Sequence, residues 1–457
     1  MQVSPARRAA FEILRRVEAE DAYSSSLLAQ TDGRLDVKDR GLCHELVLGV
    51  LRRRLWLDQS LEYFSTRKVA DLDLPVILAL RLGLYQLRFL SRVPASAAIN
   101  ESVNLVKAAR VKSAASFVNA VLRRATREPN YDPAAKATDE VQKLAIETSH
   151  PRWLIERWIS QFGIDEAASI AHANNEPAAL AFRFTAKAVH TSDRSSEQMI
   201  DELKMAGAEL IESKVAPGAW RIDQSKSTGR DGGDPHAGMR ALQRLSREGL
   251  IYFQDEASQL IAHLVGARTG ERVLDVCAAP GSKSTLIAAL APEATVFAGE
   301  FYEHRARTVR EFVAQQSADN IQVVVHDATR DLPFPNQSFD RVLVDAPCSG
   351  TGTLRHNPEL RWRLRSSDID AMAEKQRLIL KNAANAVRPG GLLVYSTCSI
   401  ERDESESVIA DFIKENREFS AERFDSPSRL RTETEALRTW PHRDDVEGFF
   451  VAALRRN

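Results

Sequence analysis

The chain has 457 residues, a formal net charge of −1 and a hydrophobic content of 44%. This length predicts several domains that each bury a core, and the composition is typical of a globular protein in water. Four cysteines are too few for a disulfide framework, so a small secreted scaffold is excluded and a cytoplasmic protein is expected. The longest apolar stretch, Leu74–Leu90, contains Arg81 and Arg88, so no run reaches the roughly 18 apolar residues of a membrane span.

Residues 1–130 are predicted to form a helical domain. Apolar residues recur there at the three-four spacing of amphipathic helices. The first 128 residues hold 21 Lys and Arg against 14 Asp and Glu, a net charge of +7 in a chain whose total is −1. Clusters such as Arg52–Arg54 and Arg123–Arg124 can be solvated helix faces. The charge asymmetry favours instead a surface that faces phosphates.

A linker and a small mixed domain are predicted to follow. Residues 131–148 are polar and include Asp132 and Pro133, which is typical of a linker. Residues 149–250 contain an apolar run at Leu180–Phe184, then a helical pattern and two short apolar runs. That order predicts an α+β domain of the RNA-recognition type. The aromatic-rich signature of a true RNA-recognition motif is absent, so stacking of bases on its sheet is not expected.

Strand and helix patterns alternate in residues 251–457. This alternation predicts a doubly wound, mostly parallel sheet of Rossmann-like type. In such a sheet a nucleotide-type ligand binds at the carboxyl ends of the strands, where the strand order reverses. The predicted strands are Arg272–Cys277, Thr295–Ala298, Ile321–Val325, Arg341–Val344, Leu392–Tyr395 and Phe449–Leu454, and the predicted helices are Lys283–Leu290, Glu303–Gln316, Ile369–Val387 and Glu404–Lys414.

The stretch Leu274–Lys283 predicts a strand, a tight turn and the start of a helix. Small residues in the turn let the backbone approach a ligand, and a helix N-terminus offers N–H groups to an anion. Glu300 ends the next strand, where a carboxylate can accept hydrogen bonds from a ribose diol, and Asp327 follows the third and could hold an adenine amine. An ordinary turn with acidic residues at strand ends is the alternative. The stretch is neither a Walker P-loop nor Gly-x-Gly-x-x-Gly, which argues against a nicotinamide site.

Two cysteines follow two of the predicted strands. Arg341–Val344 continues into Asp-Ala-Pro-Cys-Ser-Gly with Cys348, and Leu392–Tyr395 continues into Ser-Thr-Cys-Ser with Cys398. Because strand ends of a parallel sheet meet at one edge, the sequence predicts one pocket that holds both thiols. A single cysteine at such a place is usually only a buried residue. Two such cysteines beside a turn of the cofactor-binding type favour a catalytic role over a purely structural one.

These motifs resemble those of the Sun/NSUN (Fmu) family of S-adenosylmethionine-dependent RNA cytosine-C5 methyltransferases. The two-cysteine signature is similar at Pro347–Gly352 and Ser396–Ser399, and the cofactor motif at Asp275–Lys283. Ser282 stands where the family usually has glycine, and Glu300 where aspartate is commoner. The sequences Gln254–Ser258 and Glu447–Phe450 resemble the edges of the family's catalytic domain.

The N-terminal segment resembles the NusB antitermination factor. The similar stretches are Arg7–Leu14, Asp39–Arg40 and Phe117–Arg123. Together with the small α+β domain, this order of domains resembles the bacterial branch of the Sun/NSUN family that modifies 16S ribosomal RNA. The resemblance therefore implies a helical NusB-like domain in residues 1–130, and a catalytic domain in residues 251–457.

The family resemblance also implies roles for individual residues. Cys398 would be the nucleophile, Cys348 would assist release of the product, and Asp345 would contact the cofactor and the base edge. The cofactor would be S-adenosylmethionine. Its implied binding residues are Cys277, Ala278, Ala279, Pro280, Gly281, Ser282, Lys283, Glu300, Asp327 and Asp345.

The chemistry of cytosine agrees with these roles. C5 is a poor nucleophile until a group adds to C6, and a thiolate does this far better than a hydroxyl. A flipped or unpaired base is needed, because stacking shields C6. The ten His residues show no ligand spacing, so no metal is expected. We therefore expect a monomeric enzyme that methylates 16S ribosomal RNA; the alternatives are the same chemistry on transfer RNA, or a non-catalytic RNA-binding assembly or antitermination factor with a relict methyltransferase domain.

Overall fold

The computed structural model divides the chain into two compact units. It describes residues 3–31, 33–223, 236–425 and 428–457. The helical unit comprises Met1–Pro177 together with Leu354–Leu364, and the sheet unit comprises Ala178–Thr353 together with Arg365–Asn457. The division falls at residue 177, so the limits of the four predicted segments stay predictions.

The helical unit is built from amphipathic helices around one apolar core. Leu14, Leu46, Leu57 and Leu84 are completely buried in that core. Pro75 lies in the first turn of its helix, where a missing N–H costs nothing. The helices are α1 (Pro5–Ala19), α2 (Ser24–Thr31), α3 (Val37–Arg52), α4 (Arg54–Ser65), α5 (Leu74–Phe89), α6 (Ala95–Ala108), α7 (Ala115–Arg127), α8 (Glu140–Thr148), α9 (Arg152–Phe162) and α10 (Ile164–Ala173).

The arginine cluster at Arg52–Arg54 serves the fold of this unit. Arg52 is only 8% exposed and donates from Nη2 to the carbonyl of Arg355 (2.8 Å). Arg53 donates to the carbonyl of Glu147 (3.2 Å), and Arg54 forms an ion pair with Glu18 (3.2 Å). Arg52 is therefore buried among backbone acceptors, whereas Arg53 and Arg54 are partly exposed, so that a phosphate-facing surface at this cluster stays a prediction. Sequence spacing cannot separate the two cases, because the partners are far away along the chain.

The eleven-residue segment Leu354–Leu364, which includes α16 (Leu360–Arg363), folds into the helical unit and binds helix ends there. Arg361 is completely buried and donates to the carbonyls of Ser149 (3.2 Å) and Asn174 (3.2 Å), beyond the C-termini of α8 and α10. Arg363 donates to the carbonyl of Val17 in α1 (3.0 Å). A cation at a helix C-terminus is stabilised by the helix dipole. Burial lowers the pKa of Arg361 to about 9, so the group stays charged at neutral pH.

The first sheet of the sheet unit belongs to a small α+β fold. Its strands are antiparallel in the order β2-β3-β1-β4, which is the order of a ferredoxin-like βαββαβ motif. Two helices pack on it through Phe182, Met199 and Leu242. The elements are β1 (Leu180–Phe184), α11 (Ser196–Met205), β2 (Leu210–Glu212), β3 (Trp220–Ile222), α12 (Ala237–Arg247) and β4 (Ile251–Phe253).

The second sheet is doubly wound, as predicted. Its order is β10-β12-β9-β8-β5-β6-β7, with β11 paired to β12, and β5 to β9 run parallel. The chain leaves β5 toward β6 and β7 and returns on the other side with β8 and β9, so the switch point lies between β5 and β8. The strands are β5 (Arg272–Asp275), β6 (Thr295–Glu300), β7 (Ile321–Val325), β8 (Phe339–Asp345), β9 (Val387–Thr397), β10 (Phe419–Glu422), β11 (Leu437–Arg438) and β12 (Phe450–Arg456).

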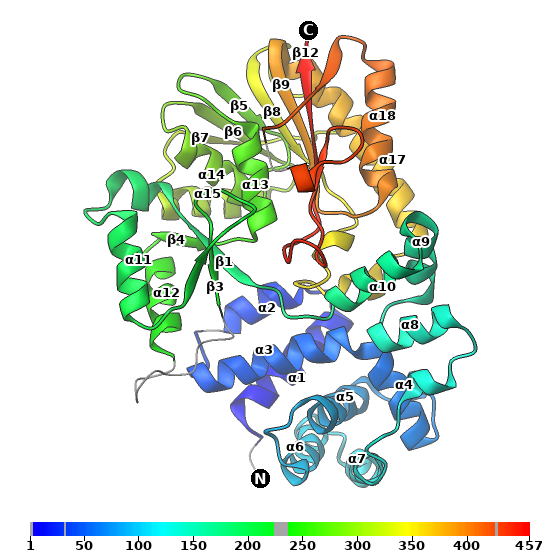
Figure 1. Ribbon diagram of the computed structural model, residues 1–457. Helices are drawn as coiled ribbons and strands as arrows, with labels where there is room; N and C mark the ends of the chain where they lie inside the picture. Colours follow the sequence, from blue (N-terminus) through cyan, green and yellow to red (C-terminus); the bar gives the residue numbers. More distant parts are fainter. Residues whose placement is uncertain (1–2, 32, 224–235, 426–427) are drawn as a thin grey trace. The chain divides into compact units, whose positions relative to one another are not determined.

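Helices cover both faces of this sheet (Figure 1). On one face α13, α14 and α15 pack with inward residues such as Val273 and Leu343, and on the other α17 and α18 pack with Leu274 and Val342. Neighbouring strand residues thus serve opposite cores, which is why the strands are apolar throughout. None of the helices in the described ranges is long and apolar enough to cross a membrane. The helices are α13 (Glu256–Val265), α14 (Ser282–Leu290), α15 (Glu303–Gln316), α17 (Ser366–Ala386) and α18 (Glu406–Glu415).

Replacing Arg361 with alanine should destabilise the helical unit by about 3–5 kcal/mol, because buried carbonyls would lose their charged donor. Hydrogen exchange in α8 and α10 should accelerate, and calorimetry should show a lower unfolding temperature. Arg8→Ala, on the exposed face of α1, is the control and should change neither. Unchanged protection of α8 in the Arg361 variant would contradict this account.

Candidate active site

Three strand ends meet at the switch point of the large sheet. Pairing sets Asp275 of β5 opposite Leu343 of β8, and Asp345 of β8 opposite Ser396 of β9. The turn after β5, the loop after β8 and the loop after β9 therefore leave the sheet beside one another. Each of the three carries residues that the sequence singled out.

The turn after β5 is shaped for close backbone approach. Gly281 has φ +105°, a left-handed conformation that glycine adopts without strain, and a Cβ there would lie 3.2 Å from Val309. The peptide before Pro280 is cis, and the N–H of Ala278 donates to the carbonyl of Gly299 (2.7 Å) in the neighbouring strand. Helix α14 begins directly after the glycine, at Ser282. Its first turn presents N–H groups at the positive end of the helix dipole.

Acidic residues follow β6 and β7, the next two strands. Glu300 is 4% exposed, and its Oε1 accepts from the N–H of Tyr302 (3.0 Å). Asp327 accepts from the N–H and the hydroxyl of Thr329 (2.9 and 2.7 Å), and these hydrogen bonds hold its pKa below the ordinary value. Asp327 is thus engaged with its own loop, whereas Glu300 is held by one backbone group and an ion pair with Arg305 (3.6 Å).

Lys283 and Asp345 form a buried ion pair. Lys283 Nζ lies 2.7 Å from Asp345 Oδ2, and Asp345 Oδ1 accepts from the Ser396 hydroxyl (2.8 Å). Burial lowers the pKa of Lys283, but Asp345 and, more weakly, Cys398 raise it, and the net pKa lies above the ordinary value. The ammonium group also lies 5.1 Å from the centre of the Phe449 ring. A permanent positive charge therefore stands among the three strand ends.

The two thiols are in contact. Cys348 Sγ and Cys398 Sγ lie 3.1 Å apart without a disulfide. The hydrogen bond to Cys398 and burial raise the pKa of the Cys348 thiol well above its ordinary value. The N–H of Gly352 donates to the carbonyl of Cys398 (3.0 Å), and a Cβ at Gly352 would collide with the carbonyl of Gly448. The loops after β8 and β9 are thus packed backbone to backbone.

Among the sequence-predicted residues, the structure brings Cys348, Cys398, Asp345 and Lys283 together. Glu300 and Asp327 end β6 and follow β7, on the side of β5 away from the thiols. Burial raises the pKa of Cys277 far above the ordinary value, as for a buried thiol with no reactive part. The other cysteine, Cys43, is completely buried in the core of the helical unit.

Two further carboxyl groups at this site escaped the sequence analysis. Burial raises the pKa of Asp275 to about 7, and its Oδ2 accepts from the Ser284 hydroxyl (2.6 Å). Glu404 is completely buried and bonds the loops of both cysteines. The sequence presents Asp275 only as part of the Asp275–Lys283 motif, and it predicts Glu404 at the start of a helix. Its distance of six residues from Cys398 gave no signal of a role.

The donor groups of the turn fit S-adenosylmethionine. That molecule carries a carboxylate, a ribose diol and an adenine amine. The first turn of α14 offers N–H groups to an anion, and Glu300 and Asp327 offer carboxylate oxygens to a diol and an amine. A doubly wound sheet with such a turn after its first strand, followed by acidic residues at the next two strand ends, is typical of S-adenosylmethionine-dependent methyltransferases.

Comparison with known proteins places the chain in a family of this class. The protein-family model described as "16S rRNA methyltransferase RsmB/F" matches residues 262–455. The NusB family model matches residues 4–127, and the model of the RsmF/B-like, ferredoxin-like domain matches residues 150–228. The chain is 33% identical to a probable ribosomal RNA small subunit methyltransferase B of Bacillus subtilis (strain 168), over 100% of both chains. The chain therefore belongs to the RsmB/F family, and the predicted family and fold class are confirmed.

Other relatives agree. Ribosomal RNA small subunit methyltransferase B of Klebsiella pneumoniae subsp. pneumoniae is 30% identical, with 99% of this chain and 98% of the relative covered. The crystal structure of PH0851 superimposes with a TM-score of 0.82 at 26% identity and covers all of both chains. NSun6 from Pyrococcus horikoshii has the same fold over 67% of this chain and 98% of its own, with a TM-score of 0.56 at 22% identity.

The raised pKa of Asp275 predicts a stability that falls as pH rises. An unfolded aspartate has a pKa near 4, so between about pH 4 and 7 the folded state holds a proton that the unfolded state has lost. This contribution is complete below pH 4 and lost through pH 7, on the order of 4 kcal/mol. Calorimetry should therefore show a smaller decrease in unfolding temperature between pH 5 and 8 for Asp275→Asn than for the natural chain. Asp327→Asn, which removes a carboxyl with a lowered pKa, should leave that decrease unchanged; an equal decrease in all three proteins would contradict the assignment.

Proposed function

We propose that the protein transfers a methyl group from S-adenosylmethionine to C5 of a cytosine in 16S ribosomal RNA, through a covalent bond between Cys398 and C6. The observation that carries this proposal is the contact between the Cys348 and Cys398 sulfurs, beside the Lys283–Asp345 ion pair. Membership of the RsmB/F family supports the choice of ribosomal RNA, and the NusB match in residues 4–127 supports RNA binding. The protein would act as a monomer in the cytoplasm.

The two thiols have different roles in this proposal. Cys348 keeps its proton, because its pKa is raised by the hydrogen bond to Cys398 and by burial. Its S–H can donate to the Cys398 sulfur, which lies 3.1 Å away. Cys398 is therefore the nucleophile that adds to C6. After the methyl group has joined C5, elimination removes the C5 proton and breaks the C6–S bond, and the leaving Cys398 sulfur then lies beside the Cys348 S–H.

Asp345 and the turn position the reactants. With one oxygen on Lys283 and the other on the Ser396 hydroxyl, Asp345 is held rigidly between the cofactor turn and Cys398. A carboxylate at the base edge favours a protonated ring nitrogen, which makes C6 more electrophilic. When bound, S-adenosylmethionine supplies an electrophilic methyl group. Residues 277–283, Glu300, Asp327 and Asp345 would hold it, and the target cytosine would enter flipped out of its helix.

Cys398→Ala should abolish methyl transfer, because no other group in this proposal adds to C6. The assay is incorporation of labelled methyl groups from S-adenosylmethionine into 16S ribosomal RNA from cells that lack the protein. Cys43→Ala, in the core of the helical unit, is the matched control and should transfer methyl groups at the normal rate. Normal turnover by Cys398→Ala would refute the mechanism, and cofactor binding without transfer by the natural chain would favour a non-catalytic RNA-binding factor.

Cys348→Ala should form the bond to C6 but release it slowly. A covalent protein–RNA adduct should then accumulate and appear as a slower band on a denaturing gel. The double variant without either thiol should form none. If Cys348→Ala gives no adduct while Cys398→Ala is inactive, product release does not depend on Cys348. Transfer RNA offered in the same assay tests the alternative substrate.

A further inference from the structure

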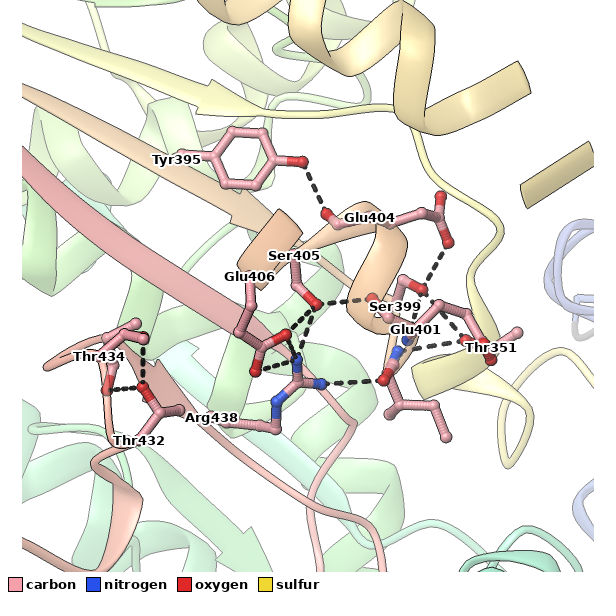
Figure 2. A network of polar contacts seen from close by, with 12 residues as sticks. Thr351, Tyr395, Ser399, Glu401, Glu404, Ser405, Glu406, Thr432, Thr434 and Arg438 are labelled. Atoms are coloured by element: carbon pink, nitrogen blue, oxygen red, sulfur yellow. Dashed lines mark hydrogen bonds and ion pairs between the residues drawn. The ribbon is translucent and has the colours of Figure 1, made fainter. Parts of the chain in front are cut away.

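Glu404 is hydrogen-bonded to the residues that follow the two cysteines. It ends the short 3-10 turn Arg402–Glu404, which follows the Cys398 loop and precedes α18. Its side chain is completely buried. Figure 2 shows the carboxylate directed toward Ser399, while the Tyr395 hydroxyl reaches the Glu404 carbonyl (2.7 Å). Backbone and side chain of this one residue are both fixed.

The carboxylate accepts four hydrogen bonds, and each comes from a group next to a cysteine loop. Its Oε1 accepts from the N–H of Ser349 (2.8 Å), and its Oε2 accepts from the hydroxyl of the same residue. Ser349 follows Cys348 directly. Oε2 also accepts from the hydroxyl of Ser399 (2.6 Å), which follows Cys398 directly. The fourth donor is Gln376 Nε2 (3.0 Å), which also donates to the carbonyl of Pro347, the residue before Cys348 (2.9 Å).

All four donors are neutral. Burial raises the pKa of Glu404 above its ordinary value, against the hydrogen bonds that lower it. Burial of a carboxyl group without a neighbouring cation costs free energy of folding. A role other than stabilising the fold is therefore expected for Glu404. By contrast, the nearby Glu406 pairs with Arg438 (2.8 Å) and accepts a hydrogen bond from Ser405 rather than from Ser349 or Ser399 (Figure 2). Glu406 therefore provides a matched control in the same polar network.

We propose that Glu404 is a positioning residue that holds the Cys348 and Cys398 loops in register and so sets the distance between the two reactive sulfurs. It contacts neither sulfur and acts through Ser349 and Ser399. Loss of its four hydrogen bonds would loosen the two loops. They would still be joined by the Gly352 N–H, which donates to the Cys398 carbonyl, by the hydrogen bond between the Ser349 and Ser399 hydroxyls (3.1 Å), and by the Thr351 hydroxyl, which bonds the Ser399 hydroxyl (3.2 Å) and accepts from the N–H of Ile400 (3.1 Å). The expected effect of Glu404 on methyl transfer rests on the proposed function. Its expected effect on the distance between the two sulfurs does not.

The geometric part is tested by oxidation. Diamide oxidises two neighbouring thiols to a disulfide, so the rate at which a Cys348–Cys398 disulfide forms in the full-length protein reports their separation, whether or not methyl transfer occurs. Cys43→Ala, Cys277→Ala is the background in which all variants are compared, so that one pair of thiols remains. Glu404→Gln should form the disulfide several-fold more slowly, since an amide nitrogen cannot accept two of these hydrogen bonds. Glu406→Gln should match the background, and an unchanged rate in Glu404→Gln would overturn the proposal.

The catalytic part is tested with the same Glu404 and Glu406 variants in the otherwise natural chain. For Glu404→Gln the kcat for methyl transfer should fall by about 10- to 100-fold, the effect of a displacement of about 1 Å in a reacting group. Its affinity for S-adenosylhomocysteine, measured by calorimetry, should not change, because the carboxylate does not touch the cofactor turn. Equal losses of kcat and of cofactor affinity would indicate general damage to the fold and overturn the proposal.

If Glu404→Gln fails to fold, single serine substitutions test the same positioning role. Ser399→Ala releases the Cys398 side and should slow formation of the covalent adduct. Ser349→Ala removes one of the two bonds on the Cys348 side and should instead slow release, so that adduct accumulates. Identical behaviour of the two serine variants would contradict separate positioning of the loops. If the natural chain transfers no methyl group at all, the proposed function fails while the disulfide rates still decide the role of Glu404.

Discussion

The site depends on the parallel pairing of β8 with β9. This pairing sets Asp345 opposite Ser396, so that the loops carrying Cys348 and Cys398 leave the sheet together. A slip of one residue would turn every side chain of a strand to the opposite face and would separate the thiols. The register is secured because both strands are buried on both faces, by α13 to α15 on one and α17 and α18 on the other. The strand register that buries both strands is therefore the same register that brings the two cysteine loops together.

Around this pair the protein keeps an unusual set of buried charges. Lys283 and Asp345 compensate each other, Asp275 stays partly protonated near neutral pH, and Glu404 is held by neutral donors. Each such group costs free energy relative to an apolar residue. Groups of this kind concentrate where chemistry requires fixed charge and fixed geometry, because water would screen both. The apolar cores of the sheet unit supply the rigidity that holds them.

The crossover from β8 to α17 contributes residues to both units of the chain. It starts with the Cys348 loop, and then its segment Leu354–Leu364 becomes part of the helical unit, where Arg361 and Arg363 bind helix C-termini. Only five residues separate Cys348 from the start of that segment. The loop of Cys348 in the sheet unit and a segment of the helical unit thus lie within one short stretch of chain.

The sequence by itself determined the doubly wound sheet, the helical N-terminal segment, the turn at Gly281 and the two cysteines at strand ends. These features are local: apolar periodicity, small residues at a turn and polar residues after a strand are all written within a few positions. Only the tertiary structure decided that Arg52 is buried, that Lys283 pairs with Asp345, and that Glu404 bonds Ser349 and Ser399. Each of these depends on a partner far away along the chain, and the partner's identity follows from how strands and helices pack. The thiol contact lies between the two cases, since the strand ends predict it but the register of β8 and β9 is what brings the two cysteine loops side by side.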